Sequence, residues 1–196
     1  MTQIQPNNAL LQEVQNAVTI LKKGGIILYP TDTIWGLGCD ATNAKAVDKI
    51  YKLKQRAESK SMLLLVDSLN RIGKYMREVP MLANDLVELA ESPLTIIYSE
   101  AINLPDNLIA KDRSIGIRVC RHAFCQQLIY RLGCPIVSTS ANISGMNHPK
   151  RLSEVSNEIA EQVDFTVNIK FEGHPTFRPS SVIKLGVKGE VEVIRD

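Results

Sequence analysis

The stretch GGIILYPTDTIWGLG, residues 24–38, decides the fold class of this chain. Glycine tolerates the left-handed conformation that ends helices, so the glycine pair predicts the end of a preceding helix. Residues 26–29 form an unbroken apolar run, which is typical of a strand buried on both faces. Pro30 ends that strand, and the residues from 31 to 38 are rich in turn-forming side chains. The stretch therefore predicts a helix, a buried strand and a turn, in that order.

The rest of the chain continues this alternation. Apolar residues at helical spacing predict helices over residues 8–23, 43–54, 68–76, 81–90, 124–132 and 152–163. Apolar runs or a two-residue period predict strands over residues 26–29, 62–66, 94–98, 115–119, 135–139, 165–169, 181–185 and 191–194. No repeat or linker divides the chain. Helices alternating with strands predict an α/β (α+β) fold, as one layered domain over residues 1–196.

The composition excludes several classes of protein. The 196 residues are 44% hydrophobic and 22% charged, and the net charge is +2, which is ordinary globular usage. No apolar run approaches the ~20 residues that a membrane span needs, and the N-terminus has no signal-peptide pattern. We therefore expect a cytoplasmic protein with no membrane contact. The four cysteines lack paired metal-ligand spacing, which predicts reduced, buried thiols rather than a zinc site.

Basic residues form the first candidate site. Lys54 and Arg56 follow a predicted helix, and Lys60 comes shortly after. If the backbone extends after Lys54, residues two apart fall on the same side. A point charge beside a planar guanidinium suits a polyphosphate. The alternative is a solvated basic face at the end of a helix.

Polar residues at the end of a strand form the second candidate site. Ser138, Ser140 and Asn142 share one face if the extended conformation persists. Their hydroxyls and amide can bind phosphate oxygens. The alternative is a loop in which these side chains cap their own backbone.

Arg118 is the third candidate, on the polar side of an otherwise apolar strand. A buried guanidinium needs an anion, so the residue forms either an internal ion pair or a clamp for a ligand carboxylate or phosphate. Residues 31–33 (Thr-Asp-Thr) are either a turn or a ligand-facing hydroxyl cluster. Trp35, the one tryptophan, is expected in the core or in a pocket wall.

Together these motifs resemble the YrdC-like family. The resemblance rests on YPTDTIWGLG (29–38), KQR (54–56), GIRV (116–119), STSANISG (138–145) and PSSVI (179–183), in the family's order. It covers residues 10 to 195 and resembles the short form without an additional C-terminal domain. It implies a twisted mixed sheet flanked by helices around a basic concave cleft.

The resemblance also implies an activity. That family makes threonylcarbamoyl-AMP and pyrophosphate from L-threonine, bicarbonate and ATP, for N6-threonylcarbamoylation of adenosine 37 in tRNA. The implied catalytic residues are Lys54, Arg56, Ser140 and Asn142. The implied ATP-binding residues are these four with Lys60, Ser114, His148 and Arg195, and the implied threonine-binding residues are Thr33, Arg118, Ser138 and Ser180. No side-chain metal site is expected, since Mg²⁺ would be carried by the ATP phosphates.

The sequence departs from the family pattern at a few loop positions. Ala57 and Ser61 stand where proline is common, residues 91–93 replace a Trp-Pro-Gly-Pro turn, Lys184 stands where an acidic residue is common, and the chain stops just after Arg195. The alternative function is a non-catalytic paralogue that binds double-stranded RNA, tRNA or the ribosome. The intact set of catalytic positions favours the enzyme, because shape-based RNA binding needs only positive charge. Transferase proteins of the same tRNA-modification route are expected partners.

Overall fold

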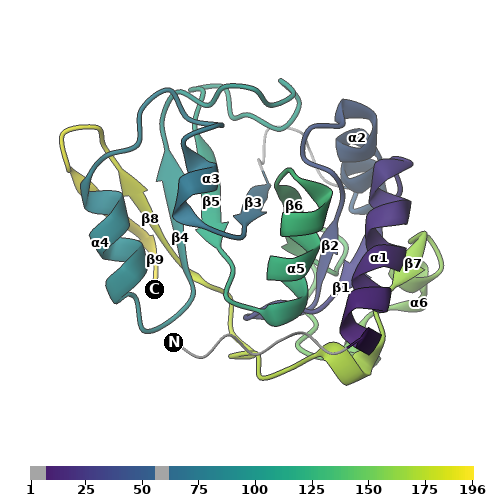
Figure 1. Cartoon of the computed structure of the whole chain (residues 1–196). Helices are drawn as coiled ribbons and strands as arrows, with labels where there is room; N and C mark the ends of the chain where they lie inside the picture. The colour runs from purple at the N-terminus through teal and green to yellow at the C-terminus, as the bar shows by residue number, and fades with distance from the viewer. Residues whose placement is uncertain (1–7, 56–61) are drawn as a thin grey trace.

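The computed structural model, which describes residues 8–55 and 62–196, contains one mixed sheet in the order β7-β1-β2-β6-β3-β5-β4-β8-β9 (Figure 1). Three neighbouring pairs, β1 with β7, β3 with β5 and β4 with β8, are parallel, and the others are antiparallel. The strands are β1 Ile27–Tyr29, β2 Gly36–Gly38, β3 Leu63–Val66, β4 Leu94–Tyr98, β5 Ile115–Val119, β6 Ile136–Ser140, β7 Phe165–Thr166, β8 Ser181–Leu185 and β9 Val191–Arg195. The predicted mixed, helix-flanked sheet is confirmed.

The helices begin and end at the residues that local chemistry favours. The α-helices are α1 Asn8–Lys22, α2 Ala44–Leu53, α3 Leu69–Ile72, α4 Leu82–Leu89, α5 Ala123–Leu132 and α6 Asn157–Ala160, and two 3₁₀ turns are η1 Leu152–Glu154 and η2 Ile169–Phe171. The Asn43 side chain accepts the Ala46 N–H at 3.2 Å and so caps α2. Gly133 ends α5 with a φ of 84°, the left-handed conformation that glycine adopts without strain.

Three sequence-based predictions were wrong in detail. The helix expected over residues 152–163 is η1 followed by α6, because Val155 and Ser156 between them are extended. The strand expected over residues 165–169 ends at Thr166, and the helix expected to reach residue 76 ends at Ile72.

The turn expected after Pro30 contains the strand β2, which the sequence did not indicate because glycine is depleted in strands. Glycine is needed here for close packing. A Cβ on Gly38 would lie 2.6 Å from the Tyr29 ring and 2.9 Å from the Val137 carbonyl oxygen.

The sheet buries apolar side chains on both faces. Leu64, Ile117 and Val137 belong to one core, which also includes residues of α2. Leu65 and Ile136 belong to a second core that α1 and α5 cover (Figure 1). Because strand side chains alternate, residues 63, 116, 118, 138 and 140 lie on the same face as Leu65 and Ile136, beyond the second core. The polar residues of β5 and β6 are therefore brought together at one place.

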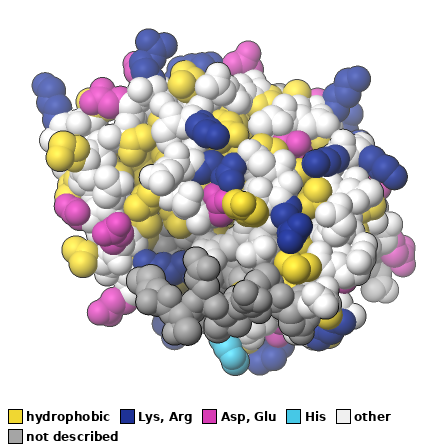
Figure 2. Space-filling model, viewed as in Figure 1, with side chains coloured by type: hydrophobic (Ala, Val, Ile, Leu, Met, Phe, Trp, Pro, Cys, Tyr) yellow, Lys and Arg dark blue, Asp and Glu magenta, His cyan; other side chains and the backbone are white. Residues whose placement is uncertain are grey.

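The surface has mixed charge. In the view of Figure 2, lysine and arginine side chains are spread among acidic and apolar ones rather than gathered in one patch. None of the helices in the described part of the chain is both long and apolar enough to span a membrane. The four cysteines are free thiols; Cys39, Cys120 and Cys125 are buried as expected, whereas Cys134 is only partly buried.

Candidate functional site

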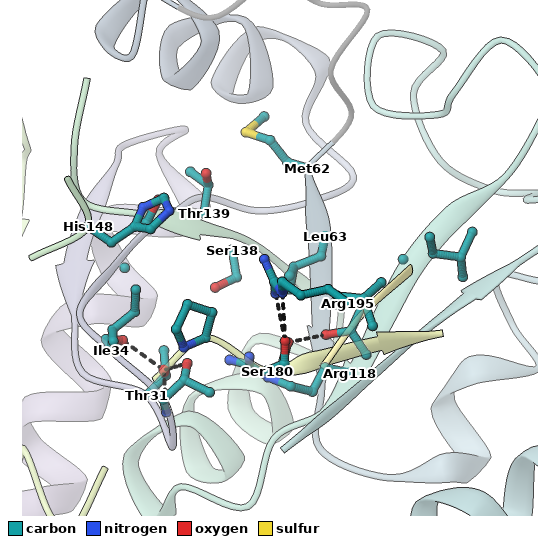
Figure 3. Close-up of a pocket in the computed structure, with 18 of the residues that line it drawn as sticks. Thr31, Ile34, Met62, Leu63, Arg118, Ser138, Thr139, His148, Ser180 and Arg195 are labelled. Atoms are coloured by element: carbon teal, nitrogen blue, oxygen red, sulfur yellow. Dashed lines mark hydrogen bonds between the residues drawn. The ribbon is translucent and has the colours of Figure 1, made fainter. Parts of the chain in front are cut away.

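A cavity of about 320 Å³ opens on the sheet face beyond the second core (Figure 3). The described residues that line it include Thr31, Thr33, Trp35, Met62, Leu63, Thr95, Ile97, Ser114, Gly116, Arg118, Ser138, Thr139, Ser140, His148, Pro179, Ser180, Val182 and Arg195. With Gly36, which also lines it, the lining residues come from seven strands and from the segments that join them. The cavity therefore contains all the residues that the resemblance assigned to threonine, and Ser114, Ser140, His148 and Arg195 from the ATP set.

Arg118 is buried in the wall of this cavity, with 4% of its surface exposed. Its Nη2 lies 3.2 Å from Oδ1 of Asp32, whose other carboxylate oxygen accepts the Arg121 N–H at 3.1 Å. The Arg118 Nε has no hydrogen-bond partner among the described residues. The predicted internal ion pair is therefore present, and the clamp for a ligand carboxylate or phosphate stays a prediction.

Arg195, on β9, is the second guanidinium of the cavity. It donates from Nε and Nη2 to the Ser180 carbonyl oxygen, at 3.1 and 2.7 Å, and the Ser180 hydroxyl is 2.8 Å from the Thr95 hydroxyl (Figure 3). Burial lowers the pKa of Arg195, and the positive charge of Arg118 lowers it further. No aspartate or glutamate is among the described lining residues. Two guanidinium groups without a lining carboxylate favour an anionic ligand.

The loop that follows β6 carries a small hydrogen-bonded cluster. The Asn142 amide donates to the backbone oxygens of Ile143 and Met146, at 2.9 and 2.8 Å, which fixes its orientation. Its Oδ1 therefore faces Nδ1 of His148 at 3.2 Å, and the Ser140 hydroxyl is 3.0 Å from the same nitrogen. Since Oδ1 only accepts, Nδ1 carries the proton, and in neutral His148 the other ring nitrogen is an acceptor.

Burial and two nearby positive charges set the protonation state of His148. Burial lowers its pKa, and the positive charges of Lys54 and Arg195 lower it further. The neutral imidazole is therefore the favoured form near pH 7.

Lys54, at the C-terminal end of α2, differs from the sequence-based expectation in its surroundings. The side chain is 1% exposed, and Nζ donates to the backbone oxygens of Ser140 and Asn142, at 2.5 and 2.6 Å. Lys54 and Asn142 are not among the lining residues. Their side chains instead donate hydrogen bonds to backbone oxygens at the end of β6 and in the loop that follows it. Arg56 and Lys60 lie outside the described residues.

Thr95, whose hydroxyl lies 2.8 Å from the Ser180 hydroxyl, was not singled out from the sequence. Asp32 belongs to the predicted turn or hydroxyl cluster of residues 31–33, but its contact with Arg118 was not predicted. Ser114 lines the cavity, but its hydroxyl donates to Asp112 at 2.6 Å and lowers the pKa of that carboxyl. Trp35 is a wall residue, as expected, and its indole N–H donates to Glu172 at 2.6 Å.

Within residues 8–55 and 62–196, no cluster of three or more histidine, cysteine, aspartate or glutamate side chains could hold a metal ion. The expectation that Mg²⁺ arrives on the ATP phosphates stays a prediction.

The mixed sheet with its flanking helices defines an α/β protein, and a cavity lined by two guanidinium groups opens on one face of that sheet. The chain belongs to the Sua5/YciO/YrdC family: the family model Sua5_yciO_yrdC, described as "Telomere recombination", matches residues 19–196. The resemblance drawn from the motifs is thereby confirmed.

Curated relatives match most of the chain. The threonylcarbamoyl-AMP synthase of Pseudoalteromonas translucida is 34% identical over 89% of this chain and 94% of its own length. The putative threonylcarbamoyl-AMP synthase of Methanocaldococcus jannaschii is 33% identical over 89% of this chain and 83% of its own length.

Solved structures share the fold. Escherichia coli YciO superimposes with a TM-score of 0.78, at 27% identity, over 95% of this chain and 89% of that chain. Pyrococcus abyssi Sua5 complexed with L-threonine has a TM-score of 0.82, at 24% identity, over 89% of this chain and 51% of that chain. This chain therefore spans about half the length of that Sua5 protein.

Proposed function

We propose that this protein is a nucleotidyltransferase that forms threonylcarbamoyl-AMP and pyrophosphate from L-threonine, bicarbonate and ATP, for tRNA modification. The observation that carries the proposal is the pair of guanidinium groups in a cavity with no lining carboxylate among the described residues. Relatives named threonylcarbamoyl-AMP synthase support the enzyme, and the fold shared with an L-threonine complex of Sua5 agrees with threonine as a substrate.

Arg118 is the proposed anchor for the threonine carboxylate. The planar, charged guanidinium lines the cavity and offers a charge-assisted site for a carboxylate. The Asp32 carboxylate keeps the guanidinium in position by its contact with Nη2. Thr33, Ser138 and Ser180 supply oxygens around this anchor.

Arg195, Ser140 and His148 form the proposed ATP side. The Ser140 hydroxyl can donate to an α-phosphate oxygen, and Arg195 supplies positive charge. The neutral His148 ring presents an acceptor nitrogen, which suits a hydroxyl or amino group of the nucleoside rather than a phosphate oxygen. Lys54 and Asn142 hold the loop that carries these groups, so we assign their part in catalysis to positioning.

The proposed reaction joins the two sides. The neutral amine of threonine forms a C–N bond with the carbon of bicarbonate, whose hydroxyl leaves as water with a proton from the amine, and a carbamate results. A carbamate oxygen then forms a bond to the α-phosphorus of ATP, while the bond from that phosphorus to pyrophosphate breaks and pyrophosphate leaves with the bonding electrons. Charge develops on the phosphate oxygens and on the leaving group, where fixed cations stabilise it. Mg²⁺ enters as MgATP. Arg56 and Lys60 remain predicted phosphate ligands.

Pyrophosphate release tests this function. We expect release that requires ATP, bicarbonate and L-threonine together, and little release when another amino acid replaces L-threonine. Product mass spectrometry checks for the threonylcarbamoyl adenylate. If no amino acid supports release and the protein instead binds double-stranded RNA with strong salt dependence, the non-catalytic RNA-binding alternative is correct. Partner transferases and tRNA stay predictions that pull-down with the purified components can test.

A further inference from the structure

A short chain of hydrogen bonds runs along one wall of the cavity. The Thr31 hydroxyl oxygen lies 2.8 Å from the Ile34 carbonyl oxygen and 2.8 Å from the Thr33 hydroxyl oxygen, and it accepts the Thr33 N–H at 3.0 Å (Figure 3). Thr31 and Thr33 are 2% and 3% exposed, so water does not compete freely for these groups.

Counting protons gives the direction of each bond. A threonine hydroxyl has one proton and two lone pairs. The Ile34 carbonyl can only accept, so Thr31 donates its one proton there. The Thr33 N–H takes one lone pair of the Thr31 oxygen, and the other lone pair faces the Thr33 hydroxyl. The Thr33 hydroxyl must therefore donate its own proton to Thr31.

This direction determines what Thr33 offers to a ligand. With its proton committed, the Thr33 oxygen presents only lone pairs to the cavity that it lines. Such an oxygen repels a carboxylate or phosphate oxygen and attracts an N–H or O–H donor. The neighbouring residue, Asp32, contacts the Arg118 guanidinium at 3.2 Å, so an acceptor and an anion-binding group occupy the same wall.

We propose that Thr31 is a positioning residue that fixes Thr33 as the acceptor for the α-amino group of the amino-acid substrate, while Arg118 binds its carboxylate. An α-amino acid carries its donor on the carbon next to its carboxylate, which matches an acceptor next to a guanidinium. Holding the amine through one N–H leaves the nitrogen lone pair available for carbamate formation. This inference rests on the proposed function and adds which group of the substrate each residue recognises.

Isothermal titration with a matched set of variants tests the proposal. Thr31→Val keeps the shape of the side chain but frees the Thr33 proton, so we expect L-threonine and L-2-aminobutyrate, which lacks the side-chain hydroxyl, both to bind about tenfold more weakly. Thr31→Ser restores the hydroxyl and should bind both within about twofold of the wild type. Binding of ATP alone should not change, which separates positioning of the amine from general damage to the cavity.

Thr19→Val is the control for replacing a threonine hydroxyl by a methyl group. The Thr19 hydroxyl also donates to a backbone carbonyl, that of Gln15 at 2.9 Å, but on the exposed helix α1. We expect this variant to bind L-threonine as the wild type does. If Thr31→Val does not fold, Thr33→Val, which removes the acceptor itself, should show the same loss for both amino acids, and Thr33→Ser should restore it.

Two results would overturn the inference. One is unchanged L-threonine affinity in folded Thr31→Val. The other is weakened L-threonine with unchanged L-2-aminobutyrate, which would mean that Thr33 accepts from the side-chain hydroxyl instead. Either result leaves the proposed function standing, whereas a wild-type protein that binds no L-threonine and releases no pyrophosphate contradicts the proposed function itself.

Discussion

The two walls of the cavity are built in different ways. The wall around Arg118 takes its polar groups from strand residues and their immediate neighbours, which are buried and held by side-chain contacts such as Arg118 with Asp32 and Thr95 with Ser180. The wall around Ser140 consists of the last residue of β6 and the loop that follows it, and the Lys54 ammonium donates to the carbonyl oxygens of Ser140 and Asn142 there. The comparison teaches that the sheet fixes the proposed amino-acid side, while the proposed ATP side depends on a few hydrogen bonds to the backbone at the end of β6 and in the following loop.

The largest expected effect comes from removing the ammonium that holds the loop. Lys54→Met leaves the Ser140 and Asn142 carbonyl oxygens without that donor, so we expect unfolding to become about 2–3 kcal/mol easier. With the loop released, kcat/KM for ATP should fall by about a hundredfold or more, while L-threonine affinity falls by much less. Thermal melts, titration and steady-state kinetics measure these three quantities.

Lys49 provides the control for this change. It lies on the same helix, α2, and its Nζ also donates to a backbone carbonyl oxygen, that of Gly24 at 2.8 Å. Lys49→Met should leave kcat/KM for ATP unchanged. Equal losses of L-threonine and ATP binding in Lys54→Met would show that the two walls are not independent.

The second prediction addresses the opposite wall. Lysine keeps the charge of Arg118 but not its planar fork, so Arg118→Lys should weaken L-threonine binding by about 1–3 kcal/mol. ATP affinity measured without threonine should barely change. Titration of each ligand separately checks this, and weakened ATP with unaffected threonine would reverse our assignment of the walls.

The third prediction separates the roles of Ser140, the last residue of β6, and Asn142, in the loop that follows. The Asn142 amide donates hydrogen bonds to two backbone oxygens. Asn142→Ala should therefore lower the free energy of unfolding by about 1–2 kcal/mol and should also lower activity. Ser140 faces the cavity, so Ser140→Ala should lower activity by about tenfold with an unchanged melting temperature. If both variants have a lowered melting temperature and normal turnover per folded molecule, Ser140 and Asn142 only stabilise the local backbone and take no part in catalysis.

The smallest expected effect is a pH dependence at His148. Its pKa lies below the ordinary value in the folded protein, so the unfolded chain takes up a proton more readily. Stability linked to this group is therefore fully present above pH 6.5 or so and is lost as the pH falls. KM for ATP should be flat from about pH 7 to 8 and rise by a few-fold in acid. His148→Asn should flatten that acid rise, and an acid rise that persists in this variant would assign it to another group.

The elements that the sequence predicted well are those in which local pattern and burial agree. The apolar run of 26–29 and the alternation of 115–119 became β1 and β5, because each residue faces the side that its chemistry prefers. The prediction of one helix over 152–163 was wrong, although the apolar residues of this segment do have helical spacing. Leu152, Val155, Ile159 and Val163 all contribute to one core, but Leu152 lies in η1, Ile159 lies in α6, and the two valines lie outside both turns. Burial of those positions does not require one continuous helix.

The sequence by itself determined the mixed sheet, the family and the chemical types in the cavity. It did not determine what each polar group faces. Lys54 looked like a phosphate ligand, yet its described partners are carbonyl oxygens 86 and 88 residues away. Arg118 was expected to form either an internal ion pair or a ligand clamp, and the structure contains the ion pair, with Asp32 from a distant part of the chain. Only the tertiary structure decided these matters, because hydrogen-bond direction depends on partners that the folded sheet brings together and that local sequence patterns do not encode.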